Sequence, residues 1–113
     1  MKAKITYQGK IISQNIKIAS GFVDNLCGFM FRSRPQDDYG IIFETSSIHT
    51  CFMRFDLDVI FLDRSDTVVK IIRAMPPWRF TKYYFRAKRV IELPGGLCPP
   101  ELKVGDRLEV GHV

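Results

Sequence analysis

At 113 residues the chain fits one domain, taken to span residues 1–113, which is long enough to bury a core of its own. A hydrophobic fraction of 46% with 26% charged residues is ordinary for a globular protein, and no window approaches the ~18 apolar residues of a membrane-spanning helix. The first residues carry no apolar signal-peptide core, so the chain is expected to be soluble and cytoplasmic.

The N-terminal third predicts two strands followed by a helix. Residues 2–7 and 10–18 are rich in β-branched residues and are separated by a Gln-Gly pair, which predicts a hairpin or two short strands. From Ser20 the apolar residues fall at helical spacing, and Gly28 stands where a helix could end. We therefore expect one short helix at about residues 20–28.

The middle of the chain is dominated by the stretch 48–63, which places a histidine, a cysteine, an arginine and three carboxylates in two predicted hydrophobic strands. Alternation with period two would put His49 and Cys51 on one face of the first strand. The second strand, 59–62, and its predicted partner, 68–74, flank a polar turn and indicate a hairpin.

The C-terminal part adds strands at 89–93 and 107–110, after a Pro-Pro pair that cannot donate to a sheet. Seven or eight short strands with one short helix indicate a mostly β, single-domain fold. The predicted architecture is a jelly-roll-like β-sandwich or a partly closed barrel.

Several blocks of this sequence, taken together, resemble the signature of the DUF192 family of small bacterial and archaeal proteins. The resemblance runs from about Ile18 to Val110. The blocks are Gly28-Phe29-Met30-Phe31-Arg32, Ser47-Ile48-His49-Thr50-Cys51-Phe52-Met53-Arg54-Phe55, Asp58-Val59-Ile60-Phe61-Leu62-Asp63, Pro77-Trp78-Arg79, Ile91-Glu92-Leu93-Pro94-Gly95-Gly96 and Gly105-Asp106.

The resemblance implies a compact jelly-roll-like β-fold with one helix and no established biochemical function. Many family members look exported, whereas this chain is expected to lack a leader. Two positions depart from the family pattern. Asp56 stands where proline is usual, and Cys51 stands where an aromatic residue is common, which argues against thiol catalysis.

His49, Cys51 and Asp58 form a candidate catalytic set, because a cysteine nucleophile needs a histidine base and the histidine needs a carboxylate to orient it. Free cysteines and lone histidines are more often structural, so a non-catalytic protein is favoured. The same residues with Asp56 would make a weak metal site. With three cysteines lacking a CxxC pair and only two histidines, we expect neither a metal nor a cofactor.

Five charged residues at strand edges and turns are favoured as a structural polar network, because carboxylates there can accept backbone N–H groups. They are Arg54, Asp58, Arg79, Glu92 and Asp106. The functional alternative is a concave site in which Arg54 or Arg79 binds an anionic ligand, with Trp78 and Phe52 as stacking surface.

The net charge of +5 is concentrated in residues 78–89, which hold five basic residues and no acidic one; the rest of the chain has 12 of each. The five aromatic residues interleaved there suit nucleic acid, since cations neutralise phosphate and rings stack on bases. The basic residues are Arg79, Lys82, Arg86, Lys88 and Arg89. The favoured interpretation is structural, with the rings filling the core and the cations reaching outward.

The sequence therefore predicts a non-catalytic module that binds a ligand or a protein, with Arg54, Asp58, Trp78 and Arg79 at its working surface. One alternative is an enzyme that uses His49 with Asp58. The other is binding of nucleic acid or another anion through residues 78–89, with Lys82, Arg86, Lys88 and Arg89. The partner, an anionic small molecule or a protein, and the oligomeric state do not follow from the sequence.

Overall fold

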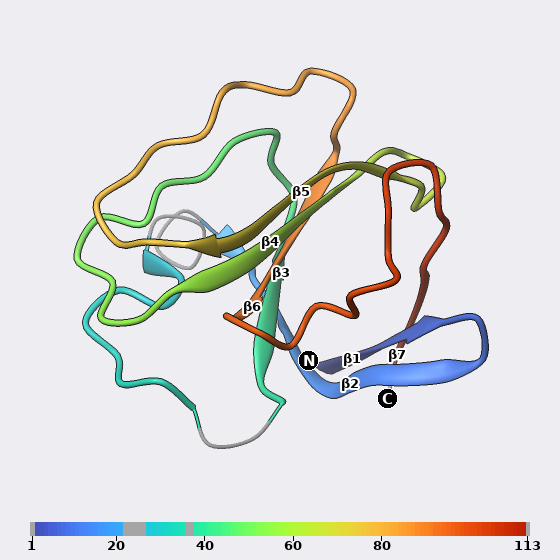
Figure 1. Ribbon diagram of the computed structural model, residues 1–113, viewed down its shortest axis with the longest axis horizontal. Coiled ribbons are helices and arrows are strands. Elements are labelled where there is room, and N and C mark those ends of the chain that lie inside the picture. Colours follow the sequence, from blue (N-terminus) through green and yellow to red (C-terminus); the bar gives the residue numbers. More distant parts are fainter. Residues whose placement is uncertain (1, 22–26, 36–37, 113) are drawn as a thin grey trace.

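Seven β-strands run through the residues that the computed structural model describes, which are 2–21, 27–35 and 38–112. They are β1 (Lys2–Tyr7), β2 (Lys10–Ile18), β3 (Gly40–Phe43), β4 (Leu57–Leu62), β5 (Val68–Met75), β6 (Arg89–Pro94) and β7 (Glu109–His112). They form one sheet in the order β5-β4-β6-β3-β2-β1-β7 (Figure 1). The prediction of a mostly β fold is confirmed, and the bounds of β1 and β2 agree with it.

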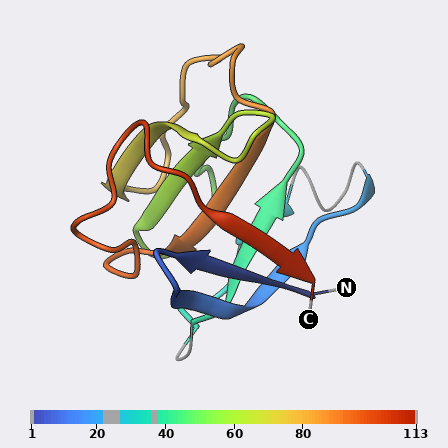
Figure 2. The ribbon, with the colours of Figure 1, turned by 90° about the vertical axis from the view of Figure 1, so that its right-hand side faces the viewer.

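The sheet is antiparallel except where β2 runs parallel to β3. At one edge β7 pairs with β1, which brings the two ends of the chain close together (Figure 2). The segment before β7 returns to the start of β5, where Thr67 bridges Arg107 and the N–H of Val68 donates to the carbonyl of Asp106 at 2.7 Å. The sheet thus curls into a half-barrel. This agrees with the partly closed barrel, whereas jelly-roll connectivity is not confirmed.

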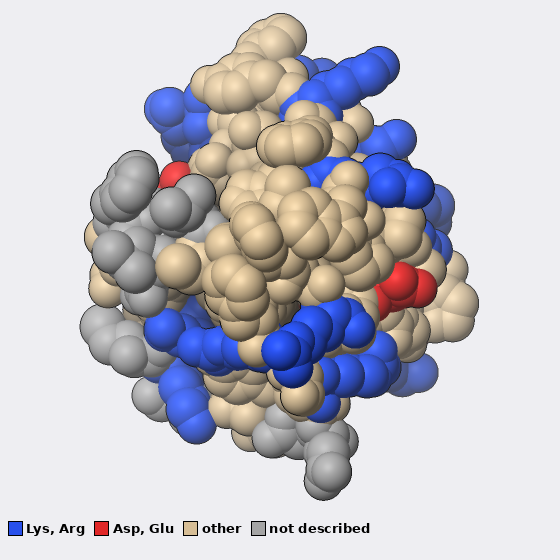
Figure 3. Space-filling view, turned by 90° about the vertical axis from the view of Figure 1, so that its left-hand side faces the viewer, with Lys and Arg blue, Asp and Glu red and all other residues tan. Residues whose placement is uncertain are grey.

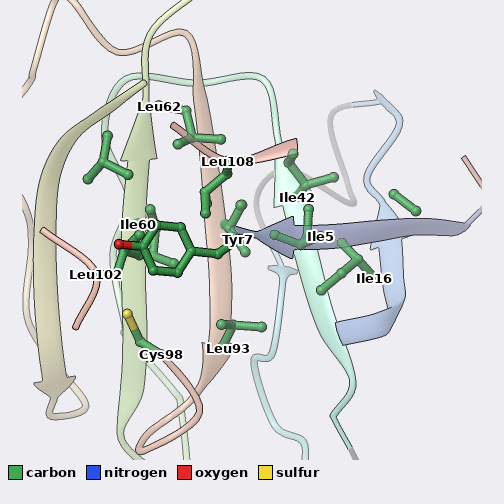
Figure 4. Packing of buried hydrophobic residues seen from close by; sticks show 13 residues of the cluster. Ile5, Tyr7, Ile16, Ile42, Ile60, Leu62, Leu93, Cys98, Leu102 and Leu108 are labelled. Carbon is green, nitrogen blue, oxygen red and sulfur yellow. The ribbon is translucent and has the colours of Figure 1, made fainter. Parts of the chain in front are cut away.

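Side chains alternate between the two faces of the sheet and build two cores. The inner core lies within the curl, where Ile60 of β4 and Ile91 of β6 meet the apolar side of β1 and β2 (Figure 4). The outer core forms on the opposite face, where Val59 of β4 and Val90 of β6 are covered by loop residues that include Phe29 and Met53. All six residues of β4 are buried, because both of its faces are covered.

Two long loops cover the outer face and shape one side of the molecule. Loops 44–56 and 76–88 lie together on the left-hand side of Figure 1. The prediction of a first strand within the stretch 48–63, ahead of the strand at 59–62, is wrong: there His49 makes a single bridge to Phe80, and the chain turns at Cys51 and Phe52. The reason is that the N–H and carbonyl groups of this stretch bond to the 76–81 segment as a loop rather than to a sheet neighbour.

The helix predicted at about residues 20–28 falls mainly on residues 22–26, which lie outside the described part. Within the part of the chain that the structure describes, no helix is long and apolar enough to cross a membrane.

Candidate functional site

Thr50 links loop 44–56 to loop 76–88 through hydrogen bonds. Its side chain is fully buried, and its Oγ1 donates to the carbonyl of Pro76 at 2.7 Å and accepts from the N–H of Arg79 at 2.9 Å. The backbone N–H of Thr50 donates to the carbonyl of Arg79 at 2.8 Å, and the N–H of Trp78 donates to the carbonyl of Thr50 at 3.0 Å. Breaking these bonds would leave buried polar groups unpaired, so the two loops hold one fixed geometry.

Three aromatic rings from three separate segments meet on the outside of this frame, and we call them the aromatic face: Phe31, Phe52 and Trp78. The ring centroids of Phe31 and Phe52 lie 5.0 Å apart, and those of Phe52 and Trp78 lie 4.7 Å apart. The side chains are 62%, 45% and 55% exposed, respectively. The rings therefore form one continuous apolar surface that water reaches.

The same three residues have left-handed backbone conformations, with φ of 63° at Phe31, 62° at Phe52 and 65° at Trp78. For a bulky residue this region costs about 1–2 kcal/mol, because Cβ approaches the following carbonyl. The loops thus hold three aromatic residues in unfavourable conformations while exposing their rings. Such strain persists where the surrounding structure fixes it and is concentrated at functional sites.

Each ring of the aromatic face is followed within two residues by an exposed arginine. These are Arg32, Arg54 and Arg79. Within the described residues, none of the three has an ion-pair partner. Figure 3 looks onto this side of the molecule and shows uncharged surface bordered by Lys and Arg atoms, with few acidic atoms. The site is therefore apolar at its centre and positive at its rim.

The structure places Asp58 away from this surface. Leu57 and Val59 point to the outer core, so Asp58 between them points to the inner side of β4. Its carboxylate accepts hydrogen bonds at 2.9 Å each from the N–H groups of Ala74, Gly96 and Cys98. Asp58 therefore fixes the turn after β6 to the β4–β5 hairpin, and it does not join Arg54, Trp78 and Arg79.

His49 and Cys51 are neighbours, but through the backbone. The Nδ1 atom of His49 accepts a hydrogen bond from the N–H of Cys51 at 3.1 Å. The imidazole lies near the ring of Phe80, with centroids 6.2 Å apart, on the outer side of the sheet. Since Asp58 points to the inner side, the three residues form no nucleophile, base and carboxylate chain.

The basic segment 78–89 divides into parts with different surroundings. Of its aromatic residues, Tyr84 packs on Phe61 with ring centroids 4.8 Å apart, whereas Phe80, Tyr83 and Phe85 are more than 70% exposed. The expectation that the rings fill the core is therefore wrong for most of them. The cations of the segment also have different partners: Arg89 forms an ion pair with Asp66, and Lys88 donates to the carbonyl of Phe85 at 3.4 Å.

The remaining charged residues of the predicted polar network have separate environments. Asp106 accepts from the hydroxyl of Tyr7 at 2.7 Å, and this hydrogen bond lowers the pKa of Asp106 while raising that of Tyr7 to about 12. Glu92 points into the outer core. Burial alone raises the pKa of Glu92 to about 8, because a desolvated carboxylate loses the solvation of its charge.

Two hollows are candidate ligand sites. One, of about 220 Å³, opens at the end of the barrel beside Ile42, Arg89 and His112, but its one arginine is already paired with Asp66. The other, of about 60 Å³, lies between His49 and Glu92. Among the residues with described positions, no three His, Cys, Asp or Glu side chains are placed to hold a metal ion.

Sequence reasoning missed Phe31 and Thr50 as parts of the site. Phe31 follows the predicted helix, and Thr50 lies in a stretch that the sequence predicts to be a strand. No local pattern marks either residue, because both act through partners at least 20 residues away in the sequence. The left-handed backbone conformations of the three aromatic residues likewise could not be predicted from the sequence.

Comparison with known proteins points to one family throughout. A profile described as DUF192, "Uncharacterized ACR", matches residues 3–110. A UPF0127 protein of Pyrococcus furiosus is 38% identical over 110 residues, covering 90% of this chain and 91% of the relative. A UPF0127 protein of Thermococcus sibiricus is 37% identical over 110 residues, covering 90% of this chain and 70% of the relative.

Two solved bacterial structures share the fold. A protein of unknown function from Novosphingobium aromaticivorans gives a TM-score of 0.77 with 22% identity, covering 96% of this chain and 84% of that one. A protein from Sinorhizobium meliloti, described as a proposed transcription regulator, gives a TM-score of 0.81 with 19% identity, covering 96% and 92%. At these identities the likeness concerns the fold alone. Because the profile spans nearly its whole length, the chain belongs to the DUF192 family.

Proposed function

We propose that the protein is a non-catalytic binding module that uses the aromatic face to bind an acidic segment of a protein partner. The observation that carries this proposal is the arrangement of Phe31, Phe52 and Trp78, whose rings touch and remain exposed although each backbone is in a left-handed conformation. A fold selected for stability alone would bury such rings or relax their backbones. Aromatic residues and arginine are the types most enriched among residues that dominate binding energy at protein interfaces.

The charges favour an acidic partner. Arg32, Arg54 and Arg79 border the rings and have no ion-pair partner among the described residues. A partner that brings carboxylates to this rim and an apolar side chain to the centre would complement both parts of the surface. Charges at the rim contribute mainly to association rate and specificity, while the apolar centre contributes most of the affinity.

A protein segment fits this surface better than single-stranded nucleic acid does. Phe52 and Trp78 meet edge to face at 60°, so their rings support each other rather than standing as separate platforms for successive bases. One cation of the basic segment, Arg89 at the start of β6, is already paired with Asp66 and is not free to contact a phosphate backbone.

The test is selection from a displayed peptide library with the wild-type protein as bait, followed by fluorescence anisotropy with the enriched peptides. We expect the enriched peptides to carry Asp or Glu beside an aromatic or aliphatic anchor. Trp78→Ala should weaken their binding at least tenfold, because truncating a central interface aromatic costs about 2 kcal/mol or more. Phe85→Ala is the matched control, since its ring is 72% exposed but lies outside the aromatic face.

Two results would contradict the proposal. Enriched peptides that bind Trp78→Ala and wild type equally would show that the aromatic face is not used. Tight, salt-sensitive binding of a single-stranded oligonucleotide, weakened by replacing Lys82, Arg86 and Lys88 with alanine, would instead support the nucleic-acid alternative.

A further inference from the structure

Glu92 is a buried carboxyl group that lacks a complete set of partners. It lies in the middle of β6 and is only 2% exposed, and its Oε1 atom accepts no hydrogen bond within the described residues. Its neighbours across the sheet are Ile41 on β3 and Val59 on β4, which offer no charge. An unpaired carboxyl in such a place costs stability, so its presence calls for a reason beyond packing.

Glu92 lines a cavity of about 60 Å³ on the outer side of the sheet, and its unpaired oxygen lies next to Gly28, another residue of the cavity wall. The cavity is lined by Gly28, Phe43, Ser47, Ile48, His49, Met53 and Glu92. Ser47, Ile48 and His49 are only half-buried, so this side of the cavity reaches the surface. One water needs about 10–15 Å³ by a comparable measure, so the cavity has room for a few heavy atoms.

Gly28 keeps this space open. A Cβ atom at this position would lie 3.2 Å from Oε1 of Glu92 and 3.2 Å from Cζ of Phe43. The backbone there has φ of 49°, which glycine adopts without strain. A larger residue would both fill the cavity and strain the turn.

The walls of the cavity define the chemistry of its ligand. Glu92 supplies an acceptor that can become negatively charged, while Phe43 and Met53 supply an apolar wall. The Nδ1 atom of His49 already accepts from Cys51, which places the proton of the neutral imidazole on Nε2. We propose that this cavity is a binding site for a primary alkylammonium group, presented by a small amine or by the tip of a lysine side chain. The ammonium would donate to Glu92, and the attached carbon would contact the apolar wall.

Binding of a cation would be coupled to loss of the Glu92 proton. Among the described lining residues, His49 is the only other titratable group, and the strands on either side of Glu92 present Ile41 and Val59. In the free protein the pKa of Glu92 is raised to about 8, so near pH 7 the carboxyl is mostly protonated. Ammonium binding favours the charged carboxylate and should therefore release about 0.9 proton near pH 7.

The experiment is isothermal titration calorimetry of the full chain with methylammonium chloride near pH 7, in buffers of different ionisation enthalpy. The expected result is binding with release of about one proton. Tetramethylammonium chloride, which has no N–H donor, should not bind. Nα-acetyl-lysine amide distinguishes the two sources: tighter binding than methylammonium indicates a lysine side chain, and weaker binding indicates a free amine.

Two test variants, one control variant and one spectroscopic signal make the test decisive. Glu92→Gln keeps the shape of the side chain but should abolish binding and proton release, whereas Glu109→Gln, an exposed carboxyl on β7, should leave both unchanged. Gly28→Ala should also abolish binding while leaving the carboxyl in place. The carbonyl-carbon NMR shift of Glu92 should move toward the ionised value as methylammonium is added.

The proposal is overturned if methylammonium leaves both the calorimetric signal and the Glu92 shift of wild type unchanged. It is equally overturned if Glu92→Gln binds methylammonium as well as wild type, or if tetramethylammonium binds as well as methylammonium. If Glu92→Gln fails to fold, the Gly28→Ala titration and the wild-type NMR signal decide the question.

Discussion

Replacing Glu92 with glutamine should change how the stability of the protein depends on pH. Glu92 lies in the centre of the sheet, and burial raises its pKa from 4.5 to about 8. Below about pH 4.5 the carboxyl is protonated in both the folded and the unfolded chain, so it adds no pH dependence there. Between about pH 4.5 and about pH 8 the folded chain holds a proton that the unfolded chain has lost, so the free energy of unfolding falls as pH rises.

The size of this effect follows from the pKa difference. Each pH unit in this range lowers the free energy of unfolding by about 1.4 kcal/mol, which amounts to about 5 kcal/mol by the time pH exceeds the folded pKa. Glutamine cannot ionise and is close to glutamate in size, so Glu92→Gln removes this pH-dependent fall in the free energy of unfolding. The variant should match wild type within about 1 kcal/mol near pH 5, where both side chains are neutral.

Urea unfolding of wild type, Glu92→Gln and Glu109→Gln at about pH 5, 7 and 9 measures this difference. The advantage of Glu92→Gln over wild type should grow steadily with pH, while Glu109→Gln should follow wild type because its carboxyl is exposed. Other titrating groups are common to all three proteins and cancel in the comparison. A constant difference between Glu92→Gln and wild type across the three pH values would refute the reasoning, because it would mean that Glu92 is ionised or hydrated in the folded protein.

Two further predictions concern the carboxylates that the structure assigns to packing. Asp58→Asn should destabilise the fold by about 2 kcal/mol or more, because an amide can no longer accept from all of Ala74, Gly96 and Cys98; urea unfolding within about 0.5 kcal/mol of wild type would contradict this role. Tyr7→Phe should raise the pKa of Asp106 toward its ordinary value, because the phenol hydrogen bond is the main cause of its depression. NMR titration of the Asp106 carboxyl would show this rise, and an unchanged titration curve would count against the bond.

The strands that alternate regularly could be predicted from the sequence. β1 and β2 carry β-branched residues around a Gln-Gly turn, and their bounds agree with the prediction. The β4–β5 hairpin was also expected, because a polar turn joins two apolar runs. In these places each residue's position is decided by neighbours a few residues away, which the sequence displays directly. The family resemblance was likewise contained in local blocks, and the profile match confirms it.

The loops and the site depended on contacts that no local pattern reveals. The 48–55 stretch alternates like a strand, yet Thr50 bonds to Pro76 and Arg79, more than 25 residues away, and turns the chain. The sequence makes Asp58 a candidate catalytic carboxylate, but in the structure its carboxylate accepts hydrogen bonds from the N–H groups of Gly96 and Cys98, about 40 residues away.

The exposure of the aromatic face depends in the same way on contacts between distant segments. The sequence suggested Phe52 and Trp78 as a stacking surface only as an alternative, and the junction of the two loops is what leaves both rings exposed. The sequence by itself determined most of the sheet-forming segments and the family, because periodicity and turn residues act over short distances. The tertiary structure alone decided which polar groups are satisfied and which rings meet water, because these depend on hydrogen bonds and packing between segments far apart in the chain.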